Sequence, residues 1–328
     1  MMKLTFDKSL FTLSAFQRTL EKISPYVLNT PVIRSYSTEE LLPDKKIYFK
    51  LEFLQPTNSF KVRGACSKLT TLNDEQLKKG LVVASGGNAG LGVCYAGKQF
   101  NSPVKVVLPE RTAKEKLEKI SKWGGEVELY GEAWDESNAY AMEYAENEGL
   151  TYVHPFDDAE VILGQGTIAL EFLQQTPDLD VIIASVGGGG LITGIGLAAK
   201  LVKDVKIWGV ETVGADALTQ SFKAGYPITL DAITSIADTL GAKRTTDRVF
   251  SLFTKAVDEM VTVTDQEALK ALEFLLENEK ILVEVSTSCI VAALLKESLF
   301  NLSDVKNIGI VICGGNISLR QLHQWGSL

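Results

Sequence analysis

Lys61 is the residue in this sequence whose surroundings best suit chemistry by a side-chain amine. It follows the short polar and aromatic run Asn58–Phe60 and stands at the start of an expected helix. One lysine alone says little, but three glycine-rich loops come later in the chain, at 85–90, 187–190 and 313–315, each after an apolar run. The lysine could act as an amine nucleophile, and the loops could hold the anionic groups of a phosphorylated cofactor and its substrate.

The glycines of these loops indicate anion-binding sites. Glycine lets successive backbone N–H groups converge, and a helix N-terminus adds about half a positive charge, so an anion can bind without a basic side chain. The consecutive glycines Gly187–Gly190 are the strongest case. Because the carboxyl ends of parallel strands line one crevice, we expect the three loops to face a common ligand.

Strands and helices alternate along the chain as in βαβ units, whose strands are parallel. Each glycine loop is expected to follow a strand and to open a helix. Expected strands span residues 46–53, 81–84, 104–109, 126–130, 181–185, 205–211 and 308–312, and expected helices include 13–23, 112–123 and 134–148. We therefore predict an α/β fold with two lobes: a small domain of residues 53–153 and a large domain of residues 1–52 and 154–328.

Composition excludes several classes of partner. The 328 residues are 45% hydrophobic, which is enough for a full core, and 33 basic against 41 acidic residues give a net charge of -8. A broad basic face for nucleic acid or an anionic membrane is therefore not expected. No apolar run approaches the roughly 20 residues that a membrane span needs. We expect a cytoplasmic protein that binds a small molecule.

Cysteine and histidine usage narrows the chemistry further. The cysteines Cys66, Cys94, Cys289 and Cys313 are scattered without a C-x-x-C pair, which favours reduced thiols over disulfides or a zinc site. Only two histidines occur, and no G-x-S-x-G motif accompanies them, which argues against a Ser-His-Asp hydrolase. We expect His154 to anchor a turn through hydrogen bonds.

A dinucleotide-binding interpretation competes with a phosphate site at Gly187–Gly190. Gly194-x-Gly196-x-x-Ala199 fits the loose fingerprint of nicotinamide-dependent oxidoreductases, and Glu211 stands where a ribose-binding acid belongs. The fingerprint should begin at the end of the strand, however, whereas Gly194 lies about one turn inside the expected helix.

Motifs along nearly the whole chain resemble one family of enzymes. They are Ser59–Ala65, Ser85–Gly90, His154–Asp158, Gly164–Thr167, Gly187–Gly190, Ser235–Ala237 and Cys313–Asn316. Together they resemble the pyridoxal-phosphate-dependent serine and threonine dehydratases of the tryptophan synthase β fold, also called fold type II. The resemblance is greatest to the serine dehydratase branch. It implies two lobes, each a mostly parallel sheet flanked by helices, with the cofactor in the cleft between them.

The resemblance assigns cofactor and substrate roles to individual residues. Lys61 would hold pyridoxal phosphate as a Schiff base, Phe60 would pack against its ring, and Asn88 would hydrogen-bond its phenolic oxygen. The cofactor phosphate would bind at Gly187, Gly188, Gly189, Gly190 and Leu191. The substrate carboxylate would bind at Ser85, Gly86, Gly87, Asn88 and Ala89.

Cys313 would face the nitrogen of the cofactor ring. An aspartate there would keep the nitrogen protonated and favour transamination or racemisation, whereas a thiol leaves the ring a weaker electron sink. The cysteine at this position resembles the residue found in the serine dehydratase branch. Ala89 also resembles that branch, because threonine dehydratases and serine racemases usually carry histidine there.

The implied reaction is β-elimination, in which Lys61 abstracts the α-proton and the β-hydroxyl leaves as water. Serine would give pyruvate and ammonia, and threonine would give 2-oxobutyrate and ammonia. Serine racemases carry a serine where this chain has Gly86, so we expect little racemisation. Serine racemase, hydroxyaspartate dehydratase and a binding protein without catalytic activity remain alternatives. The segment 282–288 also lacks the proline that is common after Glu284, which puts its turn in question.

The resemblance also implies a cation site and a homodimer. Glu211 and Ala215 match the family's ion site, and the carbonyl groups of Leu240 and Ala242 would complete it. Oxygen ligands favour hard cations. Because Ala217 stands where the serine racemase site has another acid, we expect a monovalent ion such as potassium.

Overall fold

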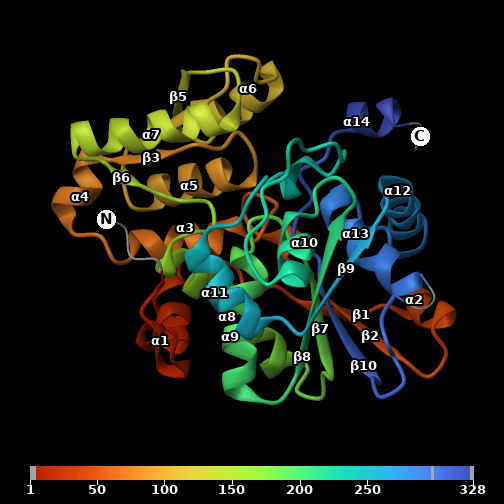
Figure 1. Ribbon diagram of the computed structural model, residues 1–328. Coiled ribbons are helices and arrows are strands. Elements are labelled where there is room, and N and C mark those ends of the chain that lie inside the picture. Colours follow the sequence, from red (N-terminus) through yellow and green to blue (C-terminus); the bar gives the residue numbers. More distant parts are fainter. Residues whose placement is uncertain (1–4, 297–298, 326–328) are drawn as a thin grey trace.

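The chain folds around two separate β-sheets, each covered by helices on both faces. The computed structural model describes residues 5–296 and 299–325. Figure 1 shows a six-stranded lobe at the lower right and a four-stranded lobe at the upper left. The expectation of two mostly parallel α/β lobes is confirmed.

The six-stranded sheet places the ends of two glycine-loop strands side by side. Its order is β1 (Val32–Arg34), β2 (Lys46–Lys50), β10 (Asn307–Val311), β7 (Val181–Ser185), β8 (Lys206–Thr212) and β9 (Glu259–Val263). Only β1 pairs antiparallel with its neighbour. Strands β7 and β10 are adjacent and parallel, so the loops that follow them emerge at the same edge.

The four-stranded sheet is fully parallel. Its order is β5 (Gly125–Leu129), β4 (Val104–Leu108), β3 (Leu81–Val83) and β6 (Thr151–Tyr152). All three residues of β3 are buried, because helices cover both faces of the sheet. The βαβ unit predicted around the first glycine loop is confirmed by the parallel pairing of β3 with β4.

Helices fill the two faces of each sheet. Those of the six-stranded lobe are α1 (Leu13–Ile23), α2 (Tyr36–Leu41), α8 (Ala159–Gln175), α9 (Gly190–Val202), α10 (Ala217–Ala224), α11 (Asp247–Ala256), α12 (Asp265–Phe274), α13 (Val285–Leu295) and α14 (Leu319–Gln324). Those beside the four-stranded sheet are α3 (Lys61–Leu69), α4 (Asp74–Lys79), α5 (Asn88–Gln99), α6 (Lys114–Lys122) and α7 (Trp134–Glu148). Short turns are η1 (Lys8–Leu10), η2 (Glu52–Leu54), η3 (Asp238–Leu240) and the π-turn η4 (Leu275–Glu279).

Helix α3 lies between the lobes and begins at Lys61. One side of α3 contacts α5 of the four-stranded lobe, and another side contacts α8 of the six-stranded lobe. Because α3 belongs equally to both, the predicted domain boundary at residue 53 stays a prediction. Helix α3 nevertheless sets where the amine of Lys61 can reach.

Two of the three glycine loops open a helix as predicted, and the third does not. Helices α5 and α9 begin within the first and second loops. After β10, Gly314 instead forms an isolated β-bridge with Ser59, and α14 begins only at Leu319. The reason is a capping box in which Ser318 caps the helix, so the helix starts there. The prediction that the third loop opens a helix is wrong.

Candidate active site

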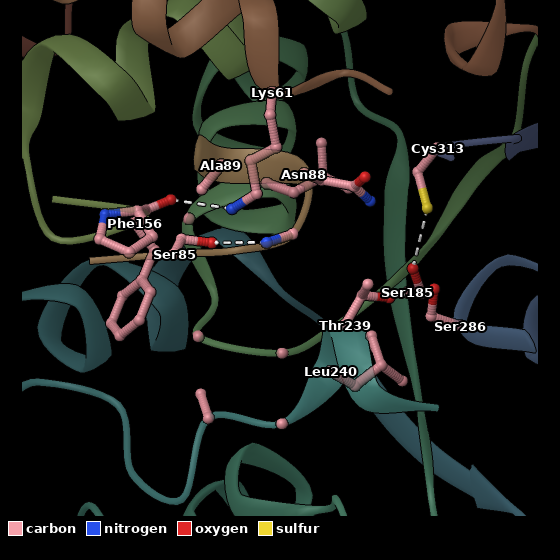
Figure 2. A pocket seen from close by; sticks show the side chains of 18 of the residues that line it. Lys61, Ser85, Asn88, Ala89, Phe156, Ser185, Thr239, Leu240, Ser286 and Cys313 are labelled. Atoms are coloured by element: carbon pink, nitrogen blue, oxygen red, sulfur yellow. Dashed lines mark hydrogen bonds between the residues drawn. The ribbon is translucent and has the colours of Figure 1, made fainter. Parts of the chain in front are cut away.

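A cavity of about 300 Å³ lies where the glycine loops meet α3. Its lining includes Lys61, Cys313, all of Ser85–Ala89 and all of Gly187–Leu191. Figure 2 shows the amine of Lys61 entering the cavity from one side and the thiol of Cys313 standing on another. The structure therefore brings the predicted cofactor and substrate residues together, although they lie on segments far apart in the sequence.

The amine of Lys61 is held inside the cavity rather than in solvent. Its Nζ donates a hydrogen bond to the carbonyl oxygen of Pro155 at 2.8 Å and lies 5.1 Å from the centre of the Phe60 ring. Burial lowers the pKa of Lys61 to about 8, against a smaller opposing effect of the Cys313 thiol. An amine with this pKa is substantially neutral in mildly alkaline solution and can act as a nucleophile or base.

The loop Gly187–Gly190 forms a cradle of free backbone donors. Among the residues that the structure describes, the N–H groups of Gly188, Gly189 and Gly190 donate to no protein acceptor. Gly189 has a φ of +93°, which a side chain would strain. A Cβ at Gly188 would lie 2.2 Å from the Phe156 ring, so a larger residue would overlap that ring.

The loop Ser85–Ala89 forms a second set of donors at the N-terminus of α5. The Ser85 hydroxyl accepts from the N–H of Gly87 at 3.3 Å, while the N–H groups of Gly86 and Ala89 have no acceptor within the described part of the chain. Ala84, just before the loop, accepts a hydrogen bond from the Trp134 indole at 2.7 Å. This loop can receive a second anion.

The thiol of Cys313 lies between two hydroxyl groups. Its Sγ is 3.3 Å from Ser185 Oγ and 3.0 Å from Thr287 Oγ1. Burial raises the pKa of Cys313 to about 11, although both hydroxyls act to lower it. The thiol is therefore neutral at physiological pH. Neither hydroxyl was predicted, because no local pattern in the sequence links these three residues.

Glu284 is a buried carboxylate on the cavity wall that the sequence motifs did not single out as functional. It accepts hydrogen bonds from the side chain of Asn88 and from the backbone N–H of Asn316. Burial raises its pKa, and these donors oppose the rise. Val285 stands where a proline is common after Glu284, and it is the first residue of α13. Proline is favoured at the first position of a helix but is not required there, so the turn before α13 forms without it.

His154 anchors the turn before α8, as predicted. Its Nδ1 accepts from the backbone N–H groups of Phe156 at 3.2 Å and Asp157 at 2.8 Å. Burial lowers the pKa of His154 to about 4, so the ring is neutral at physiological pH. The turn places Phe156 against the Gly187–Gly190 loop and Pro155 against Lys61.

Comparisons with known proteins decide the family. The sequence profile of the family described as "Pyridoxal-phosphate dependent enzyme" matches residues 23–314. This chain belongs to that family. It is 38% identical over 309 residues to an L-threonine ammonia-lyase of Thermotoga maritima, covering 93% of this chain and 75% of that protein. It is also 38% identical to a serine racemase of Arabidopsis thaliana, covering 94% and 93% of the two chains.

The solved structures agree with the fold of this family. Maize serine racemase superposes with a TM-score of 0.91 at 34% identity, covering 96% of each chain. The tryptophan synthase β-like architecture predicted for the chain is thus confirmed. As a member of the family, the protein uses pyridoxal phosphate as its cofactor.

The residues around the cavity fit pyridoxal phosphate. Its phosphate needs several hydrogen-bond donors, and Gly188, Gly189 and Gly190 present backbone N–H groups without acceptors. Its aldehyde needs an amine with a lowered pKa, which Lys61 supplies. The residues thus match the chemistry of both ends of the cofactor, and the individual roles predicted for them remain proposals.

The dinucleotide interpretation is wrong. Gly194 and Gly196 lie inside α9, where a Cβ would come within 2.4 Å of the carbonyl oxygens of Ile162 and Ala256, respectively. These glycines allow α8 and the end of α11 to pack closely against α9. Glu211 accepts hydrogen bonds from the N–H groups of Leu218 and Thr219, so it caps α10.

Two of the predicted cation ligands, Glu211 and the carbonyl oxygen of Leu240, already accept hydrogen bonds within the protein. Glu211 is fully buried, and burial raises its pKa to about 8. The carbonyl oxygen of Leu240 accepts from the N–H of Ala242 at 2.8 Å, and Ala215 is buried. Within the described residues, no group of three or more His, Cys, Asp or Glu side chains could hold a metal ion. The monovalent cation stays a prediction.

None of the helices in residues 5–296 and 299–325 combines the length and the apolar character that a membrane span requires.

Proposed function

We propose that the protein uses pyridoxal phosphate to eliminate water from L-serine, L-threonine or both, and releases ammonia and a 2-oxo acid. One observation carries the proposal: the buried amine of Lys61 shares a cavity with two separate sets of free backbone donors and a neutral thiol. Two anion sites suit a phosphate on the cofactor and a carboxylate on an amino acid. The names of the relatives support the same class of substrate.

Lys61 moves the proton in this proposal. When bound, pyridoxal phosphate withdraws electrons from the substrate α-carbon and so acidifies the α-proton. The amine of Lys61 accepts that proton once it is free and neutral, which its lowered pKa of about 8 permits. The carbonyl of Pro155, 2.8 Å from Nζ, orients the amine within the cavity.

The first glycine loop orients the amino acid. The N–H groups of Gly86 and Ala89 would receive the substrate carboxylate, which fixes the α-carbon relative to Lys61. Gly86 has no side chain that could deliver a proton to the opposite face of that carbon. We therefore propose elimination rather than racemisation as the main reaction, although a threonine ammonia-lyase and a serine racemase match the chain at equal identity.

The cavity favours a substrate without a charged side chain. Two lysines, Lys61 and Lys116, line the cavity within the described part of the chain. The Nζ of Lys116 is 3.0 Å from the carboxylate of Asp238. That pairing reduces the attraction for a second substrate carboxylate, which counts against hydroxyaspartate. Serine and threonine differ by one methyl group, which is worth only about 1 to 3 kcal/mol.

We also propose a cytoplasmic location, a homodimeric assembly and a bound potassium ion near Glu211. The negative net charge and the absence of a long apolar run support the first proposal. The dimer and the ion rest on the family resemblance, and the buried carboxylate of Glu211 is consistent with a nearby cation.

Replacing Lys61 tests the proposed function. We expect Lys61→Ala to lose the visible absorbance of the bound cofactor and to release ammonia from L-serine and L-threonine at least 1,000-fold more slowly, roughly the scale seen when a base or nucleophile is removed. Lys78→Ala, a lysine replacement at an exposed position on α4, should behave as wild type.

Chiral chromatography of the same reactions separates the alternatives. Ammonia release at the wild-type rate by Lys61→Ala would contradict the assignment of the base. D-serine formed as fast as pyruvate would instead identify a racemase, and cofactor binding without any product would identify a binding protein.

A further inference from the structure

The side-chain amide of Asn88 is held at both ends by other side chains. Its Nδ2 donates to Glu284, 2.9 Å from Oε1 and 3.1 Å from Oε2, and its Oδ1 accepts from Nδ2 of Asn316 at 2.7 Å. Asn88 is 8% exposed and Glu284 is 6% exposed. An amide nitrogen has two N–H groups, so one N–H of Asn88 remains after the bond to Glu284.

The orientation of the Asn316 amide is fixed by a carbonyl group. Its Nδ2 also donates to the backbone oxygen of Thr57 at 2.7 Å, and a carbonyl oxygen can only accept. The same nitrogen must therefore face Asn88, which requires the oxygen of Asn88 to point at Asn316. The nitrogen of Asn88 must then point the other way.

The orientation of the Asn88 amide is fixed independently by Glu284. The carboxylate lies within hydrogen-bond distance of four groups: the side chains of Asn88, Thr239 and Ser286 and the backbone N–H of Asn316. The backbone N–H of Asn316 can only donate, and it faces the same Oε1 as the nitrogen of Asn88, so this oxygen acts as an acceptor. We call the series Thr57–Asn316–Asn88–Glu284 the amide relay. An acceptor stands at each end of it, the carbonyl oxygen of Thr57 and the carboxylate of Glu284. The two acceptors impose the same orientation on the two amides between them.

The amide relay joins segments that are distant in sequence. Thr57 precedes the Phe60–Lys61 turn, Asn88 begins α5, Glu284 stands at the N-cap position of α13, and Asn316 follows the loop after β10. The bond between Asn88 and Glu284 spans 196 residues of sequence. The amide relay therefore couples the position of the lysine turn to the wall of the cavity.

We propose that Asn316 and Glu284 are positioning residues that make Asn88 present an N–H, rather than its carbonyl oxygen, to the phenolic oxygen of the cofactor. The inference rests on the proposed function, since the recipient of this N–H is the bound pyridoxal phosphate. An N–H stabilises a negatively charged oxygen, whereas an amide oxygen in the same place would repel it. Neither positioning residue needs to touch the cofactor for this effect.

Two isosteric variants test the amide relay. Asn316→Asp replaces the donor nitrogen with an acceptor, and Glu284→Gln replaces an acceptor oxygen with a donor. In Asn316→Asp the oxygen of Asn88 loses its donor, and in Glu284→Gln the nitrogen of Asn88 loses one of the two carboxylate oxygens that it faces. We expect each variant to bind pyridoxal phosphate at least tenfold more weakly and to show a shifted visible absorption band, with Lys61 still able to attach the cofactor. Asn278→Asp, the same change on the exposed turn η4, should match wild type.

Nuclear magnetic resonance of the protein without cofactor gives an independent readout. The two side-chain N–H resonances of Asn88, identified by their loss in Asn88→Asp, should be well separated in wild type, because one N–H faces a carboxylate. We expect that separation to change in both variants while the resonances of asparagines outside the amide relay stay in place. If Glu284→Gln fails to fold, Asn316→Asp decides the matter, because Asn316 is only partly buried.

The outcomes distinguish this inference from the proposed function. An unchanged Asn88 pair together with an unchanged absorption band in both variants would overturn the amide relay, even if the protein proves to be a lyase. Absence of any Lys61-dependent absorbance would overturn the proposed function, while the resonances of the cofactor-free protein would still decide whether Asn316 and Glu284 orient Asn88.

Discussion

At the scale of single residues, His154 shows how burial and hydrogen bonding together choose a protonation state. Its Nδ1 accepts two backbone N–H groups, so the proton of the neutral ring must lie on Nε2. Protonation of Nδ1 would break both hydrogen bonds and place a charge beside the amine of Lys61. Burial accordingly lowers the pKa of His154 to about 4.

This pKa predicts how stability depends on pH. The unfolded chain binds a proton at His154 near pH 6.5 and the folded chain only near pH 4, so the contribution of His154 is fully present above pH 6.5 and is lost as the pH falls toward 4. Between pH 7 and pH 5 the loss should be about 2 kcal/mol. Urea unfolding of wild type and His154→Asn at both pH values measures it.

His154→Asn is the control, because the Oδ1 of asparagine can take the place of Nδ1 and accept the same two N–H groups, and asparagine does not titrate. Carboxylates titrate equally in both proteins, so their effects cancel in the difference. Equal losses of unfolding free energy in wild type and His154→Asn would contradict the assigned role of the histidine.

Residues that serve the site through one local motif could be predicted, and residues that act through distant partners could not. Lys61, Asn88 and Cys313 each sit in a short recognisable run, and the structure places all three on the cavity. Glu284 was noticed only for a missing proline, because its bond to Asn88 spans 196 residues of sequence. No local periodicity reports such a contact.

At the scale of elements, the Gly187–Gly190 loop is shaped by a side chain from another segment. The ring of Phe156 occupies the space into which a Cβ at Gly188 would extend, at 2.2 Å from Cδ1. The backbone of Phe156 lies against Gly190 in the same way. The glycines are therefore required by close packing as well as by the need for converging donors.

We predict that Gly188→Ala weakens cofactor binding at least tenfold and lowers the free energy of unfolding by about 1 to 3 kcal/mol, the usual cost of overpacking. The double variant Gly188→Ala, Phe156→Ala should be more stable than the sum of the two single effects, because the ring that clashes is gone. Fluorescence titration with pyridoxal phosphate and urea unfolding measure both quantities. Strict additivity would show that Phe156 does not explain the need for glycine at 188.

Gly225→Ala provides the control for glycine replacement itself. A Cβ there would meet no atom within 4 Å, and the position lies at the end of α10 with a φ of +81°. It should lose about 1 kcal/mol of stability from backbone strain. Its affinity for the cofactor should not change.

The third glycine loop shows where prediction by element fails. Its strand and its glycines resemble those of the other two loops, yet Ser318 and Gln321 form a capping box that starts α14 later. Gly314 pairs with Ser59 instead, which brings Cys313 beside the lysine turn. The capping residues were present in the sequence, and their signal outweighs that of the glycines.

At the scale of the whole molecule, the alternation of strands and helices predicted two parallel sheets, but it could not say how the lobes are joined. The join is a buried group of charges beneath the lysine turn. Arg63 on α3 pairs with Glu52 of η2 and with Glu171 of α8, and Lys50 of β2 pairs with the same Glu171. Each of these contacts is 2.7 Å long.

The buried charges are balanced and fully hydrogen-bonded. Two cations face two carboxylates, and the guanidinium of Arg63 also donates to Thr167 Oγ1 and to the carbonyl oxygen of Leu28. The Arg63 guanidinium keeps the pKa of Glu52 below its usual value, although burial alone would raise it. Arg63 lies two residues after Lys61 on the same helix, so the bonds that hold Arg63 also fix the direction in which Lys61 enters the cavity.

Removal of this arginine should therefore destabilise the fold and misplace the catalytic amine at once. We predict that Arg63→Met lowers the free energy of unfolding by about 3 to 5 kcal/mol, because Glu52 is left buried without its partner. Arg63→Lys should recover only part of the loss, since an ammonium group cannot make paired hydrogen bonds to both carboxylates. Urea unfolding gives the stability, and the visible absorbance of the bound cofactor reports whether Lys61 still reaches it.

Arg111→Met is the matched control, because Arg111 pairs with Glu132 at the surface, where both side chains are mostly exposed. Such a pair is worth about 0 to 1 kcal/mol, so its loss should be small and should leave the absorbance unchanged. A loss for Arg63→Met no larger than that for Arg111→Met would show that packing, and not the buried charges, joins the lobes. A normal absorbance in a destabilised Arg63→Met would show that Lys61 is positioned by other contacts of α3.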